Sequence, residues 1–243
     1  LRLATETESI ARESDARITN SEGAEMGWGS RQIYLANSNG LMRSRRTSSA
    51  SYWTTPIAET ASGMERDYWY TSARHLEDLV SPRLVGEEAA RRTIRRLGAQ
   101  KPETCKVPVV FESTVASRLL GALSGAINGG SVYREATYLG GKLGESIAAP
   151  MVHITDDPRI IRGPASKAFD GEGLATRRHE VVKGGVLQTY LLDTYTARKL
   201  GLETTRHASR GLGGTPSPSS TNFWMAPGEH SLQELIADID NGL

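Results

Sequence analysis

The order of strand-like and helix-like segments along the chain restricts its fold to the α+β class. Arg31–Ala36 and Leu41–Trp53 alternate as strands do, and Asn37–Gly40 between them has the composition of a turn. The pair Ser81-Pro82 predicts the start of a helix over 82–97. Strands and helices do not repeat in the order of a parallel sheet, so we predict mixed and antiparallel sheets with packed helices.

The second half of the chain carries shorter segments of both kinds. Two β-rich runs flank Lys183-Gly184-Gly185, which predicts a hairpin. Ser231, with Glu234 three residues on, predicts a capped helix. The other predicted elements are strands over Val107–Phe111, Met151–Thr155 and Asn222–Met225, helices beginning at Ser113, Ser131 and Thr194, and a long loop over 208–220.

Composition excludes several classes of protein. The chain has 29 Lys and Arg against 28 Asp and Glu, and this balance argues against direct nucleic-acid binding. With 38% hydrophobic and 23% charged residues it is too polar for a membrane protein. Its one cysteine, Cys105, cannot form an internal disulfide, which predicts a cytoplasmic location.

No segment carries a complete catalytic or metal-binding motif. None of the five histidines has another four residues away, and His179-Glu180 is followed by Lys183 where a zinc motif needs histidine. There is no nucleophile elbow and no phosphate-binding loop. Asp156, Asp157 and the acids of 170–172 are better explained by turn chemistry than by a cation site. A cluster at Arg43, Arg45 and Arg46 is better explained as a solvated strand face than as a phosphate site.

Several linked motifs nevertheless resemble one family. They occur in one order over most of the chain, from about residue 17 to the end, and together they resemble the TldD/PmbA family, long labelled "modulator of DNA gyrase". The motifs are Gly63-Met-Glu-Arg-Asp-Tyr-Trp-Tyr70, Val107-Pro-Val-Val-Phe111, Asp156-Asp-Pro158, Phe169-Asp-Gly-Glu-Gly173, Gly185-Val-Leu-Gln-Thr-Tyr-Leu-Leu-Asp193, Ala197-Arg-Lys-Leu-Gly201 and Thr221-Asn222.

The resemblance implies a choice between two types of subunit. The TldD type carries His-Glu-x-x-x-His on a helix and holds the metal of a metalloprotease, whereas the PmbA type, also called TldE, lacks those ligands. The resemblance places that helix after Val107–Phe111, where this chain reads Ser117-Arg-Leu-Leu-Gly-Ala-Leu-Ser124. It therefore resembles the PmbA type, with no cofactor of its own and zinc only in a TldD-type partner. Its catalytic status stays open, and the missing motif favours a non-catalytic subunit.

The implied role is to bind and enclose unfolded peptide for proteolysis or for maturation of peptide antibiotics. An extended peptide can be held by main-chain hydrogen bonds to a strand edge, and the run Thr221–Met225 is the candidate edge. The predicted substrate-binding residues are Asp170, Glu172, Thr221, Asn222 and Phe223.

The resemblance also implies a two-part architecture. Residues 1–100 would be the end of an N-terminal α/β region, and 101–243 a C-terminal α+β domain, truncated at its end. The expected partners are a TldD-type subunit and unfolded peptide, without a membrane, and a homo-oligomer stays open for the isolated chain. Two alternatives remain: a regulatory binding protein acting on gyrase or another partner, and an enzyme with a metal site built from His153, His207 and Asp170.

Overall fold

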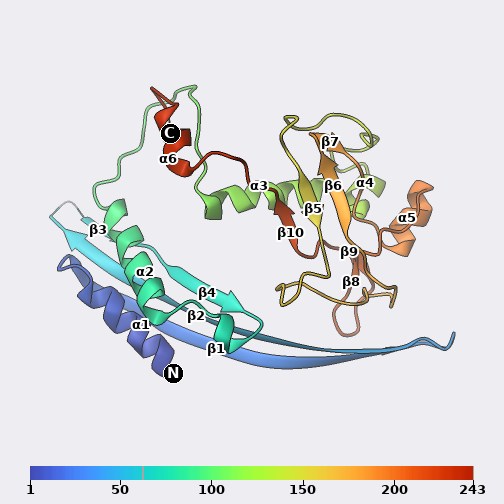
Figure 1. Cartoon of the computed structure of the whole chain (residues 1–243), viewed down its shortest axis with the longest axis horizontal. Helices are drawn as coiled ribbons and strands as arrows, with labels where there is room; N and C mark the ends of the chain where they lie inside the picture. The colour runs from blue at the N-terminus through green and yellow to red at the C-terminus, as the bar shows by residue number, and fades with distance from the viewer. Residues whose placement is uncertain (62, 243) are drawn as a thin grey trace. The chain divides into compact units, whose positions relative to one another are not determined.

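The fold consists of two compact units. A computed structural model describes residues 1–61 and 63–242 (Figure 1). Unit 1 comprises Leu1–Tyr34 and Ser44–Cys105, and unit 2 comprises Leu35–Arg43 and Lys106–Leu243. Helices accompany antiparallel sheets in both units, which confirms the α+β class.

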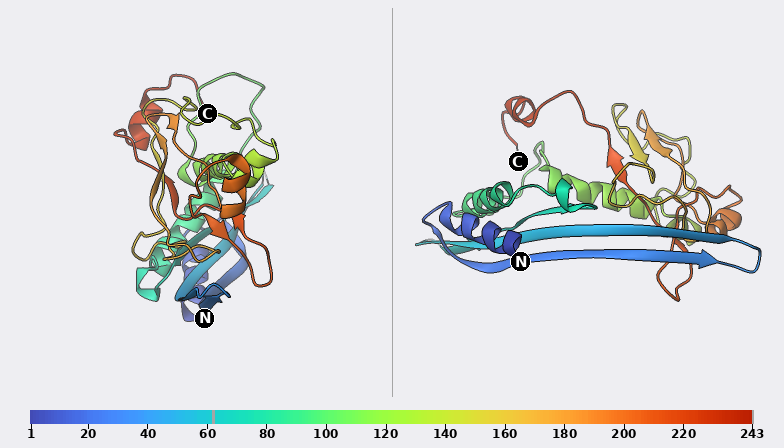
Figure 2. Two further views of the ribbon diagram at one scale, coloured as in Figure 1. Left: turned by 90° about the vertical axis from the view of Figure 1, so that its right-hand side faces the viewer. Right: turned by 60° about the horizontal axis from the view of Figure 1, so that its bottom comes forward.

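Unit 1 is built on a long hairpin. β1 (Ile18–Ala36) and β2 (Met42–Thr60) are joined at the predicted turn, and both are longer than the sequence indicated. β3 (Gly63–Arg66) pairs with the end of β2, and β4 (Trp69–Ala73) pairs with its middle. Figure 2 shows β1 and β2 continuing as a two-stranded ribbon beyond the end of β4.

Helices cover one face of this sheet. α2 (Pro82–Arg96) begins as predicted, with Leu84 N donating to the Ser81 hydroxyl at 3.4 Å, and η1 (Leu76–Asp78) precedes it. Ala58 of β2 packs with Ala90 of α2. α1 (Arg2–Glu13) was not predicted, because its buried positions are small alanines and a threonine, which give no apolar stripe.

Unit 2 contains a second antiparallel sheet. Its strands are β5 (Ile154–Asp156), β6 (His179–Lys183), β7 (Val186–Leu187) and β10 (Phe223–Met225), in the order β10-β5-β6-β7. The predicted hairpin is confirmed, and Gly184 and Gly185 take φ values of 57° and 78° at its turn. β8 (Ala208–Ser209) pairs with β9 (Ser217–Pro218) inside the segment that was predicted to be a loop.

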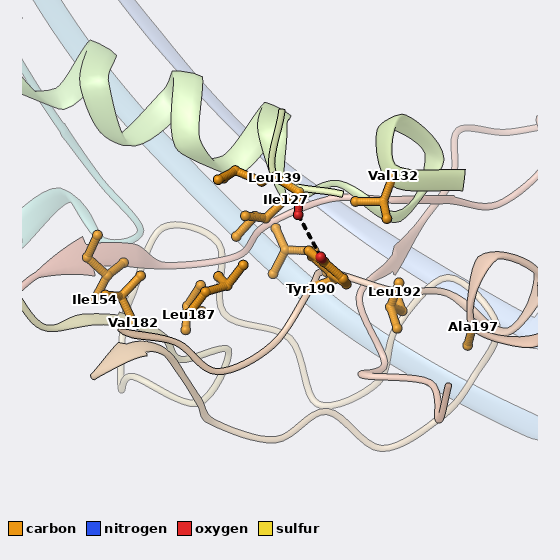
Figure 3. Close-up of a cluster of buried hydrophobic side chains, with 11 residues drawn as sticks. Ile127, Val132, Leu139, Ile154, Val182, Leu187, Tyr190, Leu192 and Ala197 are labelled. Atoms are coloured by element: carbon orange, nitrogen blue, oxygen red, sulfur yellow. Dashed lines mark hydrogen bonds between the residues drawn. The ribbon is translucent and has the colours of Figure 1, made fainter. Parts of the chain in front are cut away.

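The core of unit 2 lies between this sheet and short helices. These are α3 (Ser113–Ala126), α4 (Gly129–Tyr133) and α5 (Thr194–Leu200). A further helix, α6 (Leu232–Ala237), has no buried residue and is not part of this core. Figure 3 shows the buried cluster, in which the Tyr190 hydroxyl donates to Leu139 O at 2.6 Å. Across residues 1–61 and 63–242, no helix combines the length and apolar character needed to cross a bilayer.

Three predictions about unit 2 were wrong. Val107–Phe111 forms no strand, and Val109 and Phe111 are 48% and 49% exposed, because Pro108 lacks an amide donor and the run stays unpaired. The helix expected from Ser131 to 147 is only α4, after which glycines at positive φ impose turns. The N-cap of α3 is Glu112 rather than Ser113, since its carboxylate accepts from Thr114 N at 3.2 Å.

Candidate functional site

A buried carboxylate, Asp156, forms the polar centre of unit 2. Asp156 ends β5 and is fully buried. Its Oδ2 accepts from Thr221 N at 2.6 Å, and its Oδ1 accepts from the Thr221 hydroxyl and from His207 Nε2, the latter at 3.1 Å. Residues distant in sequence therefore meet on one side chain. We call Asp156, His207, Thr205, Thr221 and the neighbouring His179 the Asp156 centre.

His207 is held from both sides of its ring. Its Nε2 donates to Asp156 Oδ1 at 3.1 Å, and its Nδ1 lies 2.9 Å from the Thr205 hydroxyl oxygen. Thr205 Oγ1 also accepts from Leu192 N at 2.6 Å. The His179 ring lies 5.1 Å from the His207 ring, between centroids, and its Nε2 contacts Thr205 O at 2.9 Å.

The series Thr205, His207, Asp156 has the order of a nucleophile, a base and an orienting acid. Catalysis by such a series requires that a substrate carbonyl reach the hydroxyl. Here the three residues are 6%, 2% and 0% exposed, and the hydroxyl is already engaged by backbone and imidazole. The arrangement is therefore suited to joining segments of unit 2 and not to attacking a substrate.

Burial and charge shift the pKa values in this centre. Burial raises the pKa of Asp156, but the hydrogen bonds from His207 and Thr221 outweigh it, so the pKa lies below its ordinary value. Burial, followed by the positive charges of His207 and Arg177, lowers the pKa of His179 to about 4. His179 is thus neutral in the folded protein at neutral pH.

We predict that His179 makes the protein less stable in mild acid. Its pKa is lower when folded, so its contribution is complete above about pH 6.5 and is lost as pH falls toward 4. Between pH 7.5 and 4.5 this contribution should fall by about 2 kcal/mol. Urea unfolding at both pH values measures it. His179→Gln should flatten the dependence, and the exposed control His230→Gln should not; equal behaviour of the two variants would contradict the assignment.

Two of the predicted substrate-binding residues lie in a turn. Asp170 Oδ1 accepts from Glu172 N and Leu174 N, both at 2.9 Å, and Asp170 is 3% exposed. The Glu172 carboxylate accepts from Thr194 N at 3.0 Å and from the Thr194 hydroxyl, at the start of α5. These contacts fit the turn chemistry seen in the sequence, and substrate binding by these residues stays a prediction.

The other three adjoin the Asp156 centre. The side chain of Thr221 is bound to Asp156, as described above. The Asn222 amide donates to Asp157 O at 2.6 Å and to the Ser166 hydroxyl at 2.8 Å, and its oxygen accepts from Ala165 N. Phe223 packs against the core, whereas the next residue, Trp224, is 39% exposed. Thr221, Asn222 and Phe223 therefore lie together, but each has different partners. Thr221 binds the Asp156 carboxylate, Asn222 binds residues 157–166, and Phe223 packs against the apolar core.

The residues present do not fit a catalytic zinc. α3 offers hydroxyl groups, one guanidinium and apolar side chains, whereas protein zinc sites use thiolate, imidazole and carboxylate ligands. His207 is bound to Asp156, and His153 Nδ1 accepts from Gly184 N at 3.4 Å, so these histidines do not converge with Asp170. Within the described part of the chain, no group of three or more His, Cys, Asp or Glu side chains is arranged to hold a metal ion.

Comparison with known proteins identifies the family. The model of the PmbA/TldA metallopeptidase central domain matches residues 1–97, and that of the PmbA/TldA metallopeptidase C-terminal domain matches 104–243. The chain belongs to the PmbA/TldD family. Metalloprotease PmbA of Escherichia coli O157:H7 is 39% identical over 100% of this chain and 52% of the relative. The chain therefore spans about half the length of the curated relatives it matches.

Solved structures of the PmbA/TldD family have the same fold. A proposed modulator of a DNA gyrase from Thermotoga maritima matches with a TM-score of 0.89 and 29% identity, over 98% of this chain and 54% of the other. TldE of Thermococcus kodakarensis matches with a TM-score of 0.82 over 99% and 55% of the two chains; at 22% identity this shows the fold alone.

Proposed function

We propose that this chain is part of a non-catalytic, PmbA/TldE-type subunit in a cytoplasmic protease complex. The observation that carries the proposal is the composition of α3 (Ser113–Ala126), which has no imidazole, thiolate or carboxylate at the position where the family resemblance implies metal ligands. A TldD-type partner would hold the zinc and perform the hydrolysis. This chain would pair with it and help to hold unfolded peptide near that zinc.

The sheet of unit 2 offers a way to hold such a peptide. Among the residues that the structure describes, β10 stands at one end of the strand order and pairs along one edge, with β5. A peptide added to an edge is held by main-chain hydrogen bonds, which recognise extended chains of any sequence. Trp224 and Met225, 39% and 48% exposed, would supply apolar contact. The side chains of Thr221 and Asn222 already have internal partners, so the backbone and Trp224 would bind the peptide.

Co-expression of the whole protein with a TldD-type partner tests the pairing. We expect one stable complex on size-exclusion chromatography, zinc only in the partner, and cleavage of an unfolded peptide by the pair. Substitution of the partner's metal ligands should abolish cleavage. Stoichiometric zinc in this protein alone would contradict the non-catalytic role. Full cleavage by the partner without it would remove the role altogether, and binding to gyrase instead would favour the regulatory alternative.

A single substitution tests the peptide-binding edge within that complex. Trp224→Ala should raise KM for the unfolded peptide about tenfold and leave kcat nearly unchanged, because it removes binding that is equal in ground and transition states. Leu212→Ala is the matched control, since Leu212 is fully exposed in the same unit, and its KM should equal that of the wild type. An unchanged KM in Trp224→Ala would place the peptide elsewhere.

A further inference from the structure

The sheet of unit 1 ends in a long strand, β1, whose outer edge is open to further pairing. Among the residues that the structure describes, β1 stands at one end of the strand order and pairs with β2 alone (Figure 2). β1 is 19 residues long and contains neither lysine nor proline. Proteins commonly protect an exposed edge by keeping it short or by placing lysine or proline on it. An edge without these features is suited to pairing with another strand.

The main-chain groups on this outer edge come from even-numbered residues. Beside the turn of the hairpin, Asn37 N donates to Leu41 O at 3.1 Å. Main-chain groups alternate in direction along an antiparallel strand, so the odd-numbered residues of β1 direct their amides toward β2. The amides and carbonyls of Met26, Trp28 and Ser30 therefore point outward, where a further strand would meet them.

Trp28, in the middle of this edge, is unusually exposed for a tryptophan. Its exposed fraction is 79%, whereas tryptophan is mostly buried in folded proteins. A pocket of about 450 Å³ opens on its side of the sheet, with Trp28 and Leu76 in its lining, and Leu76 is 60% exposed. Tryptophan is enriched at protein interfaces. An exposed indole beside an open strand edge indicates a surface that another protein strand covers.

The charges around Trp28 suit pairing with a second copy of the chain. Glu25 and Arg31 are both exposed, and each lies three residues from Trp28, one before it and one after it. In antiparallel pairing about a two-fold axis at Trp28, Glu25 of each copy lies opposite Arg31 of the other. Opposite charges at directly opposed positions stabilise an antiparallel pair, and like charges destabilise it. Within residues 24–32 this register opposes no like charges.

We propose that two copies of this chain pair through the outer edges of β1, antiparallel and with Trp28 at the two-fold axis. In this register Met26 lies opposite Ser30, and Trp28 lies opposite its own counterpart. The opposed residues are those with outward main-chain groups, so they can exchange hydrogen bonds. A shift of one residue would oppose outward groups to inward ones, and would separate Glu25 from Arg31. The inference concerns a different sheet from the β10 edge and does not rest on the proposed function.

A second copy fits this edge better than an unstructured peptide does. A peptide of any sequence would take the main-chain hydrogen bonds but would not supply charges opposite both Glu25 and Arg31. The same patch would meet itself on both copies, as in other two-fold interfaces. One strand pair and one indole from each copy make a small interface, so we expect a dimer that dissociates on dilution.

Sedimentation velocity of the whole protein, without any partner subunit, tests the pairing. We expect a reversible dimer whose share rises with protein concentration. Arg31→Glu should raise the dissociation constant about tenfold, because Glu25 of each copy then faces a carboxylate. The double variant Glu25→Arg/Arg31→Glu should restore the wild-type affinity, since opposite charges again face each other. Arg12→Glu, at an exposed position of α1, makes the same change in net charge and should have no effect.

Cysteine crosslinking of the same protein tests the register. The Cα atoms of a directly opposed, hydrogen-bonded pair lie about 5.5 Å apart, which is within reach of a disulfide. In a Cys105→Ser background, Trp28→Cys should therefore give a crosslinked dimer under mild oxidation. Gln32→Cys, exposed on the same edge, is the control. It should not crosslink, because the proposed axis places its two copies about 27 Å apart along the strand.

Three results would overturn the proposal. They are a monomer at every concentration, equal effects of Arg31→Glu and Arg12→Glu, or no recovery in the double variant. If a TldD-type partner, but not a second copy, protects the amides of residues 24–32 from hydrogen exchange, the edge belongs to that partner and the self-pairing is wrong. These measurements involve neither zinc nor peptide cleavage, so their failure leaves the proposed function standing. Failure of the protease complex likewise leaves this pairing standing.

Discussion

Replacing Asp156 with alanine is expected to lower the free energy of unfolding by about 3–5 kcal/mol, the cost of removing one partner from a buried, hydrogen-bonded charge. The variant leaves Thr221 N, the Thr221 hydroxyl and the buried His207 Nε2 without their acceptor. Urea unfolding measures the loss, and faster amide exchange in β10 should accompany it, because the Thr221 contacts fix the start of that strand.

Asp157→Ala is the matched control for this prediction. Asp157 is the next residue, and its carboxylate accepts a local bond from Arg159 N, two residues away, at 2.9 Å. We expect the control to cost about 1 kcal/mol. Equal losses for the two variants would show that the Asp156 centre contributes nothing beyond an ordinary turn.

Gly185→Ala should be nearly as damaging, at about 3 kcal/mol or more, through the backbone rather than through charge. Gly185 has a φ of 78°, and a Cβ there would lie 2.3 Å from Ala148 O and 2.8 Å from Ala149 O. The clash would displace a backbone that also donates from Gly185 N to Val152 O at 3.0 Å. Thermal unfolding and the solubility of the variant measure the effect.

The neighbouring glycine provides the control. Gly184 also has positive φ, at 57°, but a Cβ there meets nothing nearer than Pro150 O at 3.7 Å. Gly184→Ala should therefore cost only the left-handed conformation, about 1 kcal/mol. If both variants lost the same stability, the close approach of residues 148 and 149 would not constrain Gly185.

The sequence was most informative where structure depends on local chemistry. Two helix starts and one hairpin were predicted correctly, from Ser81, Ser231 and the Gly184-Gly185 turn. Helix caps and tight turns are determined by a few neighbouring residues, so the sequence alone is sufficient to predict them. The sequence led to a wrong prediction where the structure of a segment depends on pairing with a distant strand. Val107–Phe111 has the composition of a strand, but pairing requires a second strand that composition cannot supply.

The polar centre shows the same limit. The sequence placed Asp156 in a turn-rich acidic segment and considered His207 as a metal ligand, and nothing local pairs the two. They are separated by 51 residues and meet only through the tertiary fold. One signal was present: Asp156 directly follows the predicted strand Met151–Thr155, and a carboxylate that enters the core at the end of a strand requires hydrogen-bond donors. Thr221 and Asn222 were singled out by resemblance, and the structure supplies contacts for both.

The strand order of unit 2 has a consequence for the way the protein is made. β5 lies near residue 155, but its outer neighbour β10 begins only at Phe223. A ribosome adds roughly 5–20 residues each second. The outer edge of β5 therefore stays unpaired, and Asp156 stays without its Thr221 donors, for several seconds after β5 has been synthesised. Unit 1, whose β3 and β4 follow β2 within a few residues, can close during that time. The nascent chain therefore carries an incomplete sheet in unit 2 until nearly all of the segment has emerged, and that interval is when it most depends on protection from aggregation.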